Sequence, residues 1–159
     1  MRIEAQVAGT GKKFVGEAPG LDEPGALDLL KSIALSEEEL LQQIDQLQLS
    51  ADAKRMLYTV ARTTIWAGKV VIRIGRKILE TVMWLVRSFT NAPAGLIVGS
   101  VLGILVSSIP ILGFTLGPFM TPLLVALGLA IGAVQDIKDK PLKAGIDSQV
   151  KQYENLRTT

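Results

Sequence analysis

The longest uncharged stretch of the chain runs from residue 88 to residue 135 and has the sequence SFTNAPAGLIVGSVLGILVSSIPILGFTLGPFMTPLLVALGLAIGAVQ. Its 48 residues include no Asp, Glu, Lys or Arg, and most of them are Leu, Ile, Val, Ala or Gly. Such a composition is typical of helices that pack in lipid. Helix-breaking residues interrupt the middle of the stretch, namely Pro110, Gly113, Gly117, Pro118 and Pro122. They predict a turn between two helices, at about 94–109 and about 121–134, and so a hydrophobic membrane hairpin over 91–135.

Small residues recur at every fourth position within this hairpin. The two runs are Gly95, Gly99, Gly103, Ser107 and then Gly128, Gly132. In lipid, close contact across small residues drives helices together. The spacing therefore predicts helix packing, either of the hairpin on itself or between copies of the protein.

The segment before the hairpin, residues 51–90, predicts one long basic amphipathic helix. Ser50 is a suitable N-cap, and no proline follows until Pro93. On a helical projection most of the charged residues fall in one narrow sector, and the basic ones form a cationic stripe made of Arg55, Arg62, Lys69, Arg73, Arg76, Lys77 and Arg87. Trp66 and Trp84 lie in or beside this stripe, where interfacial aromatic rings are common. On the opposite side Ala61, Gly68 and Gly75 recur every seven residues and predict close approach of another helix.

Two interpretations of the cationic stripe stay open. The basic residues either meet anionic lipid headgroups or face water or an oligomer lumen while the apolar side packs on other helices. Nucleic acid is the least favoured partner, because a run of charge is more often a solvated face.

The two ends of the chain are smaller units. Residues 1–50 carry nine acidic and four basic residues, and predict a short strand over 1–8, a loop and a capped helix. Ser36 and Glu39 have the spacing of a capping box. This acidic region is a candidate contact for a protein partner. Residues 136–159 predict a mixed-charge helical tail that begins at Pro141.

Several function classes are excluded by composition. The chain has no Cys and no His, which removes thiol nucleophiles, zinc fingers and catalytic triads that use His. No group of acid and base residues stands out for catalysis. The sequence therefore predicts a protein that is not an enzyme and that uses no cofactor and no metal.

Basic residues flank the hairpin at both ends, which predicts a membrane protein with both termini in the cytoplasm. The expected fold class is all-α: the long basic helix, the hydrophobic hairpin broken by glycine and proline, and a small acidic N-terminal region. Over 51–135 this order of segments resembles the hydrophobic hairpin of pore-forming colicin domains in arrangement, without a shared motif.

The predicted function is that of a small self-assembling membrane protein, pore-forming or membrane-permeabilising in the manner of a toxin or defence effector. Its partners would be the lipid bilayer and further copies of itself. The alternative is a structural membrane anchor or scaffold subunit that tethers a larger cytoplasmic complex.

Overall fold

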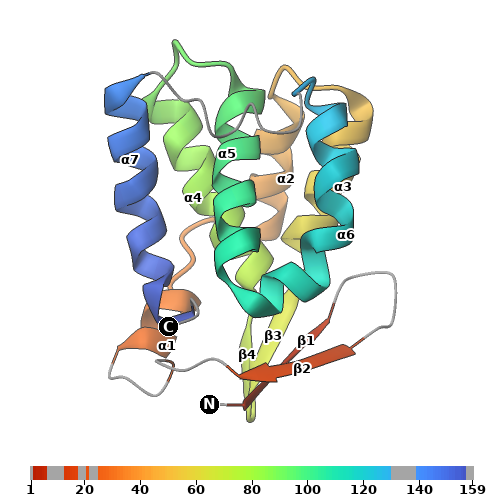
Figure 1. Ribbon diagram of the computed structural model, residues 1–159, viewed down its shortest axis with the longest axis vertical. Coiled ribbons are helices and arrows are strands. Elements are labelled where there is room, and N and C mark those ends of the chain that lie inside the picture. Colours follow the sequence, from red (N-terminus) through yellow and green to blue (C-terminus); the bar gives the residue numbers. More distant parts are fainter. Residues whose placement is uncertain (1, 7–12, 18–20, 22–24, 130–138, 157–159) are drawn as a thin grey trace.

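Two hairpins from distant parts of the chain form one antiparallel sheet, which lies at one end of the helices (Figure 1). The computed structural model describes residues 2–6, 13–17, 21, 25–129 and 139–156. The strand order is β2-β1-β3-β4, with β1 at Arg2–Gln6, β2 at Lys13–Glu17, β3 at Thr64–Ala67 and β4 at Val70–Ile72. The fold is therefore mixed α/β, and the prediction of an all-α fold is wrong.

Strand β1 forms where alternating residues predict it. Ile3 and Ala5 are buried, while Arg2 and Glu4 on the other side are exposed. Such alternation is typical of a strand with one face on the core. In the ladders Glu4 stands opposite Val15 of β2 and opposite Trp66 of β3.

The predicted long helix over 51–90 is interrupted by the second hairpin. Helix α3 (Ala51–Ala61) begins at its N-cap Ser50 as expected, but the chain then enters β3 and β4 before α4 (Ile74–Ser88). Ala67 pairs with Val70, which leaves a two-residue turn. Gly68 is the first residue of this turn and has a φ of +64°. Glycine adopts this conformation without a steric clash because it has no Cβ, and glycine at this position is typical of a type II′ hairpin. β-branched residues on both sides of the turn favour the strands over a helix.

The remaining helices lie before α3 and after α6 in the sequence. Helix α1 (Ala26–Lys31) precedes α2 (Glu37–Asp45), and the predicted capping box of α2 is confirmed. The Glu39 N–H donates to Ser36 Oγ at 3.1 Å, and the Ser36 N–H donates to Glu39 Oε2 at 3.4 Å. Helix α7 (Lys140–Val150) is capped by Asp139 and continues as a 3-10 helix, η2 (Lys151–Leu156).

The uncharged stretch forms two helices that differ from the predicted pair. Helix α5 (Ala94–Ser108) covers nearly the same residues as the first expected helix. Helix α6 (Pro110–Ala126) begins two residues later and contains the region that was predicted as a turn. Pro118 and Pro122 lie within it on its exposed side, so that neither ring enters the core. Because proline has no N–H, the carbonyls of Phe114 and Pro118 lose their helical donors.

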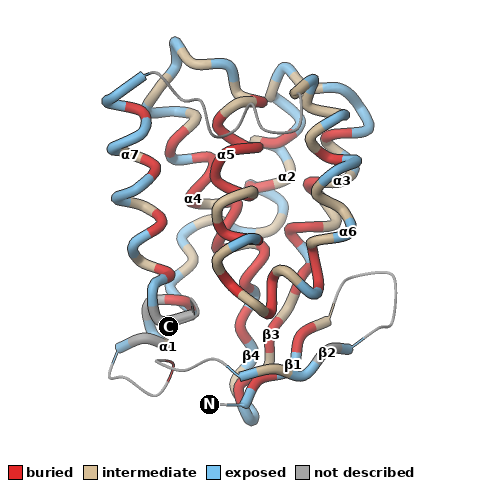
Figure 2. Tube along the Cα trace, viewed as in Figure 1, coloured by how far each residue is buried: buried red, intermediate tan, exposed pale blue. Residues whose placement is uncertain are grey.

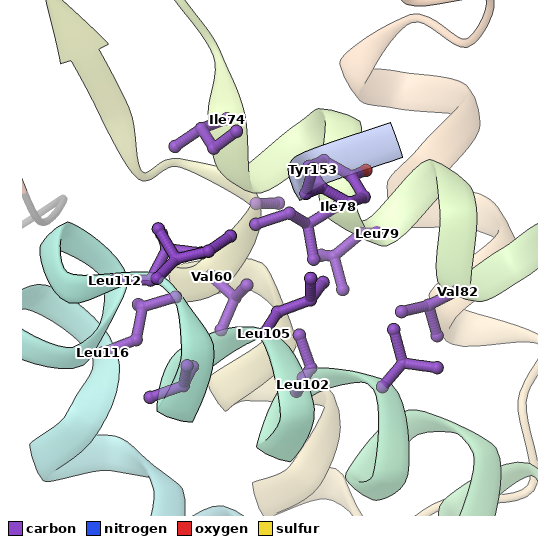
Figure 3. Close-up of a cluster of buried hydrophobic side chains, with 14 of the residues drawn as sticks. Val60, Ile74, Ile78, Leu79, Val82, Leu102, Leu105, Leu112, Leu116 and Tyr153 are labelled. Atoms are coloured by element: carbon purple, nitrogen blue, oxygen red, sulfur yellow. The ribbon is translucent and has the colours of Figure 1, made fainter. Parts of the chain in front are cut away.

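Helix α5 lies at the centre of the helices and is buried along most of its length (Figure 2). It packs against α4, α6 and α7. In Figure 3, Leu102 and Leu105 of α5 point into the same cluster as Ile78 of α4 and Leu116 of α6. Each Å² of apolar surface that is removed from water stabilises the fold by about 25 cal/mol. The apolar side chains of α5 therefore find their partners within the protein itself.

Among the residues that the structure describes, no helix combines the length and the apolar character needed to cross a bilayer. With 15 residues, α5 is about 23 Å long against about 30 Å of hydrocarbon. The predicted transmembrane hairpin is therefore wrong, and so are the membrane location and the membrane topology that were predicted from it.

Candidate functional site

The outer face of α6 is the most apolar exposed helix surface among the residues described. We use this name for the exposed side of α6, made of Phe114, Pro118, Thr121, Pro122 and Val125. Phe114, Pro118, Thr121 and Val125 follow one another at steps of four, three and four residues, and Pro122 is four residues after Pro118, which places all five on one side of the helix. Phe114 is 65% exposed and Val125 is 66% exposed. The opposite side of α6 is buried against α5 and α3.

No charged residue interrupts this surface from within its own helix or from α5. The chain has none between Arg87 and Asp136, so both helices are uncharged throughout. Monomeric proteins rarely leave an extended apolar surface in water, and such surfaces commonly mark contact sites. The arrangement is suited to binding another apolar surface rather than to chemistry.

Two of the predicted packing glycines lie against the end of α6 in the same molecule. A Cβ added at Gly99 would lie 2.6 Å from Leu129 Cδ1, and one at Gly95 would lie 3.1 Å from the Leu127 carbonyl oxygen. Gly103 is half-buried, and the exposed Ser107 donates its hydroxyl to the Ile104 carbonyl.

Gly128, the first residue of the second predicted run, does not lie in a helix. Gly128 follows the end of α6 with a φ of +77°, which L side chains rarely adopt. Gly132 lies outside the described residues.

The predicted groove of Ala61, Gly68 and Gly75 does not exist, because these residues do not share a helix. Ala61 ends α3, Gly68 turns the β3–β4 hairpin, and Gly75 lies in the first turn of α4. A Cβ at Gly75 would lie only 1.7 Å from the Val60 carbonyl oxygen. Gly75 therefore lets the start of α4 pass directly against the end of α3.

The cationic stripe is also divided among several elements. Arg55 pairs with Asp52 at 3.0 Å on α3, Lys69 is exposed in the hairpin turn, and Arg87 is exposed at the end of α4. Lys77 is only 8% exposed and donates from Nζ to the Ser32 carbonyl at 2.9 Å. The other three members, Arg62, Arg73 and Arg76, line one small hollow together with Glu37. The sequence did not predict this convergence, because it depends on the β3–β4 hairpin.

Trp84 lies in a groove of about 410 Å³ between α4, α7 and the segment that joins α1 to α2. Beside it, Glu80 Oε2 accepts hydrogen bonds from the N–H groups of Ala34 and Leu35 at 3.0 and 3.3 Å. Deeper, the hydroxyls of Thr81 and Tyr153 are 2.8 Å apart, and Tyr153 also donates to the Lys77 carbonyl at 3.2 Å. Burial raises the pKa of the Tyr153 hydroxyl, so this network stays neutral. These polar groups hold the C-terminal segment and the α1–α2 link to α4.

Trp66 lies on the outer side of the sheet, beneath Lys13, whose Nζ is 5.7 Å from the centre of the indole ring. A hollow of about 560 Å³ lies here. Its lining has two basic residues, Arg2 and Lys13, and one acidic residue, Glu4, beside Trp66 and Gly68. The two tryptophans that were predicted to share one interface therefore lie on separate surfaces. The Glu4 carboxylate offsets one of the two positive charges of this hollow, so the lining has a smaller charge excess than the hollow between Arg62, Arg73 and Arg76.

Within the described part of the chain, no group of three metal-ligating residues lies together. The chain matches no known protein family, no curated protein and no solved structure.

The sequence does not predict the outer face of α6, because the prolines at positions 110, 118 and 122 favour a turn there. One signal was present: Phe114, Pro118 and Pro122 recur at every fourth residue, so that both prolines fall on one side of a helix. A helix can accept proline there when the freed carbonyls face outward.

Proposed function

We propose that this protein is a self-associating binding protein without enzymatic activity, and that two copies meet through the outer face of α6. The observation that supports this proposal is the exposure of Phe114 and Val125 on a helix that has no charged residue. The proposal keeps the self-assembly predicted from the sequence and does not keep its membrane setting.

A second copy suits this face better than a charged partner does. A charge brought against the outer face of α6 would lose its hydration and would find no opposite charge there. A second copy offers the same uncharged surface, so that two copies meet without burying a charge. Contact between identical patches gives a closed two-fold dimer, the commonest symmetry among soluble oligomers.

Sedimentation velocity over a wide range of protein concentration tests this proposal. The expected wild-type species is a dimer. Val125→Glu places a carboxylate in the contact and should raise the dimer dissociation constant by about tenfold or more. The matched control is Val15→Glu, because Val15 is also an exposed valine, at 53%, but lies on the sheet.

The control should remain as dimeric as the wild type, and circular dichroism should show both variants folded. A wild-type protein that stays monomeric at every concentration would contradict the proposal, and so would equal dimerisation of the Val125 and Val15 variants. Another protein as the natural occupant of this face would give the first of these results.

A further inference from the structure

Three arginine side chains from the ends of two helices converge on one small hollow. Arg62 is the C-cap of α3, Arg73 is the N-cap of α4, and Arg76 lies one turn further along α4. Together with Ala61, Thr64 and Glu37 they line a volume of about 70 Å³. A water molecule occupies about 30 Å³ in the liquid, so the hollow has room for one small group.

The backbone holds these three residues together firmly. The Gly75 N–H donates to the Thr63 carbonyl at 3.0 Å, and the Thr63 N–H donates to the Val60 carbonyl at 3.1 Å. These bonds tie the first turn of α4 to the last turn of α3 across the β3–β4 hairpin. The positions of the arginines are therefore set by secondary structure and not by a surface loop.

Charge in the hollow is unbalanced. Its one carboxylate, Glu37, contacts Arg62 at 3.6 Å between Oε1 and Nε, and the lining keeps an excess of two positive charges. Arg73, the N-cap, and Arg76 both lie at the start of α4, where the helix dipole disfavours positive charge. The Arg76 Nε is buried and has no hydrogen-bond partner among the described residues. A buried donor without an acceptor is unusual in a folded protein.

We propose that this hollow, the arginine site, binds a phosphate group, either as the free ion or as a phosphomonoester. A phosphate dianion matches the excess of two positive charges and offers several acceptor oxygens to three guanidinium groups. A carboxylate brings one charge and two oxygens, and would leave part of that excess unpaired. The site is independent of the outer face of α6, since its residues lie on α2, α3, β3 and α4.

The test is the thermal midpoint of the wild-type protein in rising concentrations of inorganic phosphate, phenyl phosphate and acetate at constant ionic strength. A ligand that binds only the folded protein raises the midpoint progressively, with the logarithm of the ligand concentration once that concentration exceeds the dissociation constant. Phosphate should do so and acetate should not. An equal response to phenyl phosphate would identify the phosphomonoester as an accepted form, and a response to inorganic phosphate alone would restrict the site to the free ion.

Variants separate this site from general effects of salt. Arg73→Gln should weaken phosphate binding by about tenfold or more, because it removes a charged donor. In the absence of phosphate it should unfold no earlier than the wild type, since it also removes like-charge repulsion. The control Arg55→Gln, on the exposed part of α3, should keep the full response.

The proposal would be overturned if acetate stabilised the protein as well as phosphate did. It would also be overturned if Arg73→Gln kept the wild-type response to phosphate. Isothermal titration with inorganic phosphate gives a second readout that does not depend on the unfolding midpoint.

Discussion

At Gly75 the start of α4 crosses the end of α3 with no room for a side chain. An added Cβ would lie 1.7 Å from the Val60 carbonyl oxygen and 2.9 Å from its carbon, and both are backbone atoms. Gly75→Ala should therefore reduce the free energy of unfolding by about 3 kcal/mol, as measured by chemical denaturation.

Gly117 gives the matched control for this substitution. It lies inside α6, and nothing is within 4 Å of the position that its Cβ would take. Gly117→Ala should change the free energy of unfolding by less than about 1 kcal/mol, because the better helix propensity of alanine is offset by the ring of Pro118, which disfavours the helical conformation of a preceding residue that has a Cβ. Similar losses in both variants would show that the crossing at Gly75 is not the tight contact described here.

Tyr153 reports on the attachment of the C-terminal segment. Its hydroxyl bonds to Thr81 and to the Lys77 carbonyl, and Tyr153→Phe should cost about 1 kcal/mol of stability at neutral pH. The variant keeps the ring and so keeps the apolar packing. Urea denaturation measures the loss, and an unchanged stability would mean that the hydrogen bonds contribute nothing net.

The same residue predicts an alkaline limb of the stability profile. Burial raises the pKa of Tyr153 above its ordinary value of 10.0, so the unfolded chain releases this proton first as the pH rises. The contribution of the protonated Tyr153 hydroxyl to the free energy of unfolding should therefore be fully present below about pH 10. Above that pH the free energy of unfolding should fall, by up to about 1.4 kcal/mol per pH unit. Tyr153→Phe should show a shallower fall than the wild type. Parallel profiles would contradict the assignment.

At the scale of elements, Gly68 distinguishes the β3–β4 hairpin from the single helix that the sequence suggests. In a helix interior Gly68→Ala would stabilise the protein by about 1 kcal/mol. In the turn, where φ is +64°, it should destabilise by about 1–2 kcal/mol. The sign of the change decides between the two, and Gly68→Asn should cost less than Gly68→Ala because Asn tolerates this conformation better.

Elements with strong local signals could be predicted from the sequence. The alternation of β1, the capping box of α2, the N-cap of α3 and the proline at the start of α7 all depend on neighbouring residues. The β3–β4 hairpin was missed because its segment fits two periods: its basic residues fit a helical face, while its β-branched residues fit strands. Pairing with β1, about 60 residues away, favours the strands, and no local pattern shows that pairing.

The arginine site could not be predicted for the same reason. Its three arginines all belong to the cationic stripe expected on one helix, but in that helix Arg62 and Arg73 would be three turns apart. In the structure the β3–β4 hairpin reverses the chain between them and brings the two residues to the same hollow. Only the tertiary structure shows which cations meet and which, like Arg55, find a separate partner.

At the scale of the whole molecule, the uncharged stretch serves two purposes that composition alone does not separate. Helix α5 fills the centre of the helices, and α6 covers the core on one side while it exposes Phe114 and Val125 on the other. A run of 48 residues without charge is as compatible with a buried central helix as with a membrane hairpin. The length of α5 and the partners around it decide between them.

Site-specific cross-linking can show whether a second copy covers the outer face of α6. The chain has no cysteine, so Thr121→Cys introduces a single thiol in the middle of this face. In a two-fold dimer, residues near the axis lie close to their own counterparts. A short bismaleimide should therefore link the Thr121→Cys protein into covalent dimers. It should leave Ser88→Cys, with an exposed thiol at the end of α4, as monomers. Covalent dimers from Ser88→Cys and none from Thr121→Cys would show that two copies do not meet through the outer face of α6.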